Sequence, residues 1–146
     1  MKVVQKEAFW VIGFQVQATY DQLWNKMPEA WQDFYQSAQD IPNRKNDIYM
    51  DISFGKNQYG IYTQFIGAEI TDQEAKVPKN MQKIQISAKK YLHHTHEGAL
   101  KHIANSFQEL YERAKEKNLQ TRDFKLDIGY KPNESERPHE LFIEIL

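Results

Sequence analysis

The sequence predicts an α+β fold in which two strand–helix–strand–strand units form one antiparallel sheet with two helices and a central cleft. Residues 31–57 align with residues 107–133 without a gap at an offset of 76 (107 − 31), and seven of these 27 positions are identical. The apolar periodicity changes from helical to alternating in the same order in both halves. Because one helix leaves much of a three-stranded sheet uncovered, two units together make a more complete layered core.

The first unit begins with a β-rich run over residues 3–16, followed by apolar residues at spacings of three and four over 20–38. This spacing predicts a helix that Thr19 or Asp21 caps. Pro28 lies inside it and removes one backbone hydrogen bond, so we expect a kink or a restart there.

Alternating apolar residues from Ile48 to Phe54 then predict a strand with one apolar face, and residues 61–70 a second strand after a turn. The second unit repeats this order, with a strand at 84–95, a helix at about 97–117 and strands at 123–131 and 140–146. The seam falls at residues 76–81, which gives one domain with pseudo-repeats of about 1–75 and 80–146.

Composition narrows the classes of function. The 146 residues include no cysteine, which excludes a disulfide framework, a thiolate nucleophile and a cysteine zinc site. A net charge of −1 with both signs interspersed argues against nucleic acid as a direct partner. The N-terminal stretch has no long apolar run, so we expect neither a secretory signal nor a membrane partner, and a cytoplasmic location.

Two aspartates are the leading acidic candidates. Asp51 and Asp127 are equivalent under the repeat, and each lies on its strand opposite the apolar face. A solvated polar face and an acidic pocket both fit this alternation. Glu69 and Glu144, near the ends of the matching strands, are weaker candidates.

Four segments carry a resemblance to a known family: Leu23-Trp24, the tyrosine-rich hairpin 49–70, YLHHTHEG at 91–98 and RDFKLD at 122–127. Over essentially its whole length the chain is similar to the GyrI-like domains, the duplicated effector-binding modules also attached to AraC- and MerR-type transcription regulators. The resemblance implies binding of amphipathic, often cationic molecules, including drugs, in an aromatic cleft with an acidic residue. One position departs from the family, because Lys125 stands where a glutamate is common.

Under this resemblance we expect a small-molecule-binding protein without catalysis, cofactor or metal. The expected ligand-binding residues combine aromatic walls with two carboxylates: Trp10, Trp24, Tyr49, Asp51, Tyr62, Tyr91 and Asp127. The repeat uses residues from about 3 to 146, so we expect a stand-alone module without a DNA-binding arm. Any control of transcription would then act through another chain.

Two other functions remain open. Some GyrI-like proteins are hydrolases, and others inhibit gyrase by protein–protein contact, so a small hydrolase and a protein-binding inhibitor are the alternatives. The sequence shows no common nucleophile motif, and Ser53 has no histidine spaced to partner it. The His93–His96 run offers two histidines on one strand face without a third ligand, which makes a poor zinc site.

Overall fold

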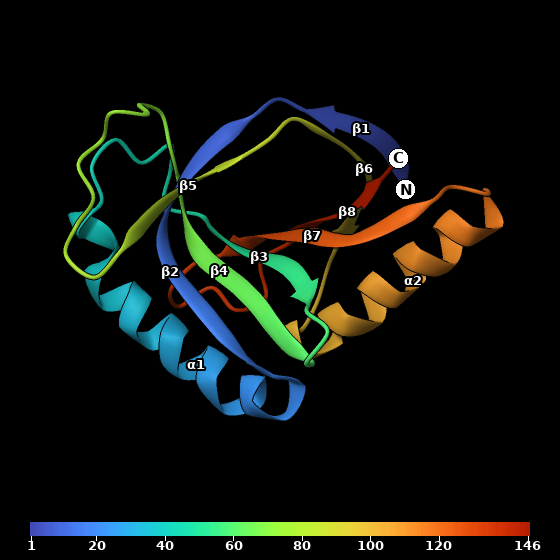
Figure 1. Ribbon diagram of the computed structural model, residues 1–146, viewed down its shortest axis with the longest axis horizontal. Coiled ribbons are helices and arrows are strands. Elements are labelled where there is room, and N and C mark those ends of the chain that lie inside the picture. Colours follow the sequence, from blue (N-terminus) through green and yellow to red (C-terminus); the bar gives the residue numbers. More distant parts are fainter.

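The computed structural model describes residues 1–146 and contains one eight-stranded antiparallel sheet with both helices on the same side (Figure 1). The strands are β1 (Lys2–Lys6), β2 (Phe9–Thr19), β3 (Tyr49–Lys56), β4 (Ile61–Ile70), β5 (Gln82–Ile86), β6 (Lys89–His96), β7 (Thr121–Tyr130) and β8 (His139–Ile145). The helices are α1 (Tyr20–Ser37) and α2 (Ile103–Glu116), with short 3-10 turns at Ala38–Asp40 and Leu100–His102. The predicted α+β fold with a single antiparallel sheet is confirmed.

The structure adds one strand to each expected unit. Strand structure is interrupted at residues 7–8, between β1 and β2, and again at residues 87–88, between β5 and β6. β1 pairs with β6 and β5 pairs with β2, so the first strand of each half extends the sheet of the other half. The strand order β1-β6-β8-β7-β3-β4-β2-β5 is therefore symmetric about the β7–β3 pair. The repeat limits of 1–75 and 80–146 stay a prediction.

Helix α1 continues through Pro28, so the predicted restart does not occur, and the predicted kink stays a prediction. Thr19 caps its first turn, accepting a hydrogen bond from the Gln22 backbone N–H while the Gln22 side chain accepts one from the Thr19 N–H. Pro28 lies inside the helix without ending it. The apolar residues after the proline, Trp31 and Phe34, are buried against the sheet, and this packing holds the second half of the helix in place.

Three hydrophobic clusters form the core. One lies between α1 and the sheet around Phe34 and Ile66, and a second lies between α2 and the sheet around Leu110 and Leu141. A third, which includes Ile52, occupies the opposite sheet face, as strand alternation requires. Each helix packs mainly on the outer strands of its half, α1 on β2 and β4 and α2 on β6 and β8. The central strands β3 and β7 lie between the two helices, and neither helix packs mainly on them (Figure 1).

No helix in the structure is both long enough and apolar enough to span a lipid bilayer.

Candidate ligand-binding cleft

A cavity of about 320 Å³ lies over the central strands β3 and β7, between the two helices. Its size falls in the range typical of small-molecule sites. Half of the lining is hydrophobic, and the polar side chains come mainly from β3 and β7. The lining residues are Trp24, Asp51, Ser53, Gln64, Leu100, Lys101, Ile103, Ala104, Phe107, Lys125, Asp127 and Tyr130.

Two paired aspartates belong to the lining of this cavity. Asp51 on β3 and Asp127 on β7 are direct partners in the strand register. The sequence repeat also relates them, since 51 + 76 = 127. The pseudo-twofold axis of the molecule therefore passes between two carboxylates that project from the same sheet face.

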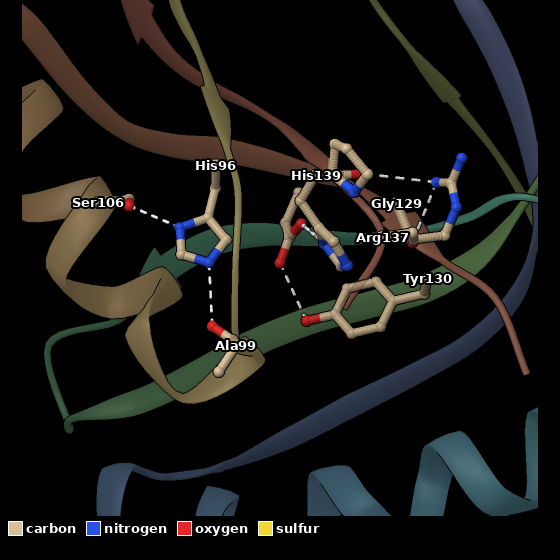
Figure 2. A network of polar contacts seen from close by, with 9 residues as sticks. His96, Ala99, Ser106, Gly129, Tyr130, Arg137 and His139 are labelled. Atoms are coloured by element: carbon tan, nitrogen blue, oxygen red, sulfur yellow. Dashed lines mark hydrogen bonds and ion pairs between the residues drawn. The ribbon is translucent and has the colours of Figure 1, made fainter. Parts of the chain in front are cut away.

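Asp127 is fully engaged within the protein. The Tyr130 hydroxyl donates a hydrogen bond of 2.9 Å to Asp127 Oδ2, and Nδ1 of the buried His139 ring lies 2.5 Å from Asp127 Oδ1. Figure 2 shows Tyr130 and His139 converging on this point. Gly129 makes room for the histidine, because a Cβ there would lie 2.6 Å from the His139 ring. Trp31 of α1 stacks on Tyr130 with ring centroids 4.2 Å apart, which holds the tyrosine in place.

Asp51 is engaged through one oxygen. The Gln64 side-chain amide donates a 2.9 Å hydrogen bond to Asp51 Oδ1, while Oδ2 forms no hydrogen bond within the chain. Burial raises the pKa of Asp51 to about 7, and the charge of Asp127 adds to this effect. The Gln64 hydrogen bond and the Lys125 charge act in the opposite direction. The cavity therefore contains a carboxyl group, that of Asp51, with one oxygen free of hydrogen bonds. This group gains or loses its charge near neutral pH.

Gln64, the partner of Asp51, and His139, the partner of Asp127, occupy equivalent places in the sheet. Gln64 on β4 lies opposite Ser53, two residues after Asp51. His139 begins β8 and lies beside Gly129, two residues after Asp127. The repeat thus supplies each aspartate with a supporting side chain from the next strand, and the halves differ in which side chain it is.

Lys125 brings a positive charge into the same cavity. Its ammonium lies 5.5 Å from the Phe107 ring centroid and 5.7 Å from that of Tyr111, both on α2. Burial lowers the pKa of Lys125, while the nearby charges of Asp123 and Asp51 raise it. Cation–π contacts offset part of the cost of burying the ammonium.

The rim of the cavity is aromatic and open. Trp24 is 71% exposed although it is a large apolar side chain. The Tyr20 ring packs edge-on against it, with centroids 6.3 Å apart, and Tyr62 packs on Tyr20 at 6.0 Å. Leu100 faces the same opening from the α2 side. An exposed apolar cluster beside a cavity is typical of a binding site.

Three of the seven residues expected from the sequence line the cavity, namely Trp24, Asp51 and Asp127. Tyr62 reaches only the rim, through Tyr20. The other three aromatic residues require correction, because packing takes each of them away from the cavity.

Tyr91 is fully buried in the cluster on the opposite sheet face, beside Phe142. Tyr49 lies on the correct face but is buried against Phe34, and its hydroxyl accepts a hydrogen bond from Arg44. Trp10 packs at the edge of the α1 cluster, near the Lys83 ammonium. These residues serve the core and do not form cavity walls.

Sequence reasoning missed several residues of the site. Phe107, Tyr130 and Gln64 line the cavity and His139 contacts Asp127, but none of them was among the expected ligand-binding residues. Strand alternation contains a signal for His139, because it shares a face with Leu141 and Ile143 of the α2 cluster. The expected strand started at residue 140, one position too late to include it.

The histidine run serves the fold. The buried His96 ring is hydrogen-bonded to the Ser106 hydroxyl at 2.7 Å and the Ala99 carbonyl at 3.0 Å, which ties β6 to α2 (Figure 2). His93 contacts Glu140 across the strands. No group of three or more histidine, aspartate or glutamate side chains in the structure is arranged to hold a metal ion. The site's one buried histidine, His139, pairs with Asp127 and not with the Ser53 hydroxyl.

Comparison with solved structures identifies proteins of the same fold. A protein called SAV2435, solved with tetraphenylphosphonium bound, has a TM-score of 0.73 at 12% identity, over 99% of this chain and 93% of its own. The C-terminal domain of EcmrR has a TM-score of 0.70 at 12% identity, covering 99% and 96%. A Listeria innocua protein described as a hydrolase has a TM-score of 0.55 at 8% identity, covering 99% and 92%. The fold therefore occurs in a protein solved with a bound organic cation and in a protein described as a hydrolase.

An integron cassette protein of Vibrio cholerae, VCH_CASS2, has a TM-score of 0.64 at 16% identity, covering 99% of this chain and 95% of its own. No curated protein sequence matches the chain significantly. The family model of Cass2, the integron-associated effector binding protein, matches residues 2–146. The chain therefore belongs to the Cass2 family of effector-binding proteins and has the GyrI-like fold that its sequence resembles.

Proposed function

We propose that this protein binds a small amphipathic molecule through a positively charged group, which pairs with Asp51, and an apolar body, which lies against Trp24 and Phe107. The observation that carries the proposal is the free Oδ2 of Asp51 in a cavity lined by aromatic side chains. The effector-binding family and the tetraphenylphosphonium complex of SAV2435 support it.

The physical basis is partial desolvation of the acid. A carboxylate removed from bulk water attracts a cation strongly, by about 4 kcal/mol at 4 Å with an effective dielectric constant of 20. The ring faces of Trp24 and Phe107 add cation–π attraction and apolar contact. Asp127 has both oxygens bonded within the protein, so it acts on the ligand mainly through its field and through its effect on Asp51.

The arrangement favours binding over catalysis. A hydrolytic site of the nucleophilic type needs a base in hydrogen-bond contact with a hydroxyl. Here the base, His139, is buried against Asp127, and Ser53 lies on β3, separated from β8 by β7, without a histidine partner. We accordingly propose an effector-binding module and not an enzyme.

The test uses two ions of nearly equal size and shape and of opposite charge. Tetraphenylphosphonium and tetraphenylborate are titrated by isothermal calorimetry into the wild type and into Asp51→Asn at pH 8. We expect the wild type to bind the cation at least about tenfold more tightly than the anion. Asp51→Asn should remove most of that preference, while Asp33→Asn, on the exposed face of α1, should leave it unchanged.

Equal binding of both ions by the wild type would contradict a charge-selective site. Loss of cation binding in Asp33→Asn as large as in Asp51→Asn would show that net charge, and not the cleft, controls affinity. Binding of neither ion would overturn the ligand-binding proposal and favour a function by protein–protein contact.

A further inference from the structure

The cavity is not symmetric, although the fold around it is. Five of its lining residues come from the α2 side (Leu100, Lys101, Ile103, Ala104 and Phe107), whereas α1 contributes Trp24 alone. The repeat places Tyr49 in the first half where the second half has Lys125, since 49 + 76 = 125. Tyr49 fills the α1 side as a buried ring, while Lys125 leaves room on the α2 side and lines it with a cation.

The ammonium of Lys125 has no ionic partner within the protein. The ion pairs of the chain involve Lys45, Lys89, Lys131 and other basic residues, and Lys125 forms neither an ion pair nor a hydrogen bond. Its neighbours are the faces of Phe107 and Tyr111. A half-buried ammonium held over aromatic faces and open to a cavity is well placed to receive an anionic group.

Asp51 and Lys125 lie on the same sheet face as diagonal neighbours. Asp51 pairs with Asp127, and Lys125 precedes Asp127 by two residues on β7 and pairs with Ser53. Diagonal neighbours have Cβ atoms about 7 Å apart or slightly less, so the two charged groups can be bridged by one small molecule without contacting each other. A purely cationic ligand at Asp51 is repelled by Lys125, whereas a ligand with both charges is attracted by both.

We propose, on the basis of the function proposed above, that the ligand of this cleft is a zwitterionic amphiphile. Its ammonium group meets Asp51 Oδ2, its acidic group meets the Lys125 ammonium, and its apolar body lies between Phe107 and Trp24. Lys125 is thus a residue that determines specificity.

The experiment compares three molecules with the same phenylalkyl body. These are 2-amino-4-phenylbutanoate, which is zwitterionic, 3-phenylpropylamine, which lacks the carboxylate, and 4-phenylbutanoate, which lacks the amine. Each is titrated by calorimetry into the full-length wild type at pH 8. We expect the zwitterion to bind at least about tenfold more tightly than either of the other two.

Substitution of Lys125 then tests whether this residue causes the preference for the zwitterion. Lys125→Met, with Lys125→Gln as a second variant in case the first folds poorly, should weaken binding of the zwitterion about tenfold and strengthen binding of the amine. Lys6→Met is the matched control. Lys6 also lies over an aromatic ring, that of Phe142, and burial also lowers its pKa, but it lies outside the cavity, so the ranking should not change.

The inference and the function on which it rests fail in different ways. If the amine binds the wild type as tightly as the zwitterion does, and Lys125→Met only strengthens the amine, the zwitterion proposal is wrong and the cation site stands. If none of the three binds while tetraphenylphosphonium does, the zwitterion proposal is again overturned. If tetraphenylphosphonium also fails to bind, both proposals fall.

Discussion

Asp51 and Asp127 face each other across the two central strands, and the internal repeat relates one to the other. In the second half, His139 and Tyr130 bond both oxygens of Asp127. In the first half, Gln64 bonds one oxygen of Asp51 and leaves the other free. The repeat supplies two equivalent acids, and the neighbouring strands give them different partners. Asp127 is bonded within the protein through both oxygens, whereas Asp51 keeps one oxygen free, which is why we propose it as the ligand's partner.

The largest effect is expected in the second half, where Asp127 has hydrogen-bond partners at both oxygens. Asp127→Ala leaves the buried His139 ring and the Tyr130 hydroxyl without their partner, and we expect a loss of roughly 2–4 kcal/mol in the free energy of unfolding. Asp51→Ala removes one hydrogen bond to a partly exposed amide and should cost about 1 kcal/mol or less at pH 7. Urea denaturation of both variants measures the difference. Equal losses would contradict the division of roles.

The second prediction concerns stability as a function of pH. The pKa of Asp51 is raised to about 7 in the folded protein, so between about pH 4 and pH 7 the folded state binds more protons than the unfolded state. Ionisation of Asp51 therefore lowers the free energy of unfolding as pH rises through that window. We expect Asp51→Asn, which still accepts the Gln64 hydrogen bond, to be more stable than the wild type at pH 8 by roughly 1–3 kcal/mol after solvent screening, and not at pH 4.

Denaturation midpoints of wild type and Asp51→Asn at pH 4, 6 and 8 test this sign. A variant that is less stable at pH 8, or a difference that is the same at all three values, would show that ionisation of Asp51 does not oppose folding.

The third prediction is a pH-dependent affinity. Because the charged form of Asp51 binds a cation and the neutral form does not, the affinity for tetraphenylphosphonium should rise by up to about tenfold between pH 6 and pH 8. The rise should disappear in Asp51→Asn. Calorimetric titrations at both pH values provide the measurement, and a fall in affinity with rising pH would have the wrong sign for this site.

The smallest effect is expected from a substitution that makes the two halves more alike. His139→Gln gives Asp127 the same kind of partner that Gln64 gives Asp51. We expect a loss of about 1 kcal/mol in stability, because the amide can still donate to Asp127 while the packing of the ring against Gly129 is lost. The affinity for tetraphenylphosphonium should change less than in Asp51→Asn. A larger change in affinity than in Asp51→Asn would show that the second half, and not the first, carries the cation.

Local patterns predicted much of this molecule. The helical spacing before Trp31 and the alternation around Ile52 identified α1 and β3, because both elements have one apolar face that must be buried. The repeat also indicated that Asp51 and Asp127 would be equivalent. The repeat could not indicate that the two residues pair directly, since this depends on contact between β3 and β7, which are 65 or more residues apart (121 − 56 = 65).

Other features depend on contacts that the sequence does not encode locally. The breaks at residues 7–8 and 87–88 are only two residues long, so one β-rich run reads as one strand until its two parts pair with different partners. Tyr91 illustrates the sensitivity of side-chain placement to strand alternation, because neighbouring residues on β6 point to opposite faces of the sheet. Its aromatic character suggested a cavity wall, but its position on the strand places it in the core.

The most direct test of the central claim, that Asp51 carries the charge that meets the ligand, is the number of protons released when tetraphenylphosphonium binds at pH 7. This number follows from calorimetric titrations in buffers with different ionisation enthalpies. We predict a release of up to about half a proton by the wild type, because Asp51 is then partly protonated and must ionise to pair with the cation. The same release should occur in Asp33→Asn and vanish in Asp51→Asn. Undiminished proton release by Asp51→Asn would contradict the assignment.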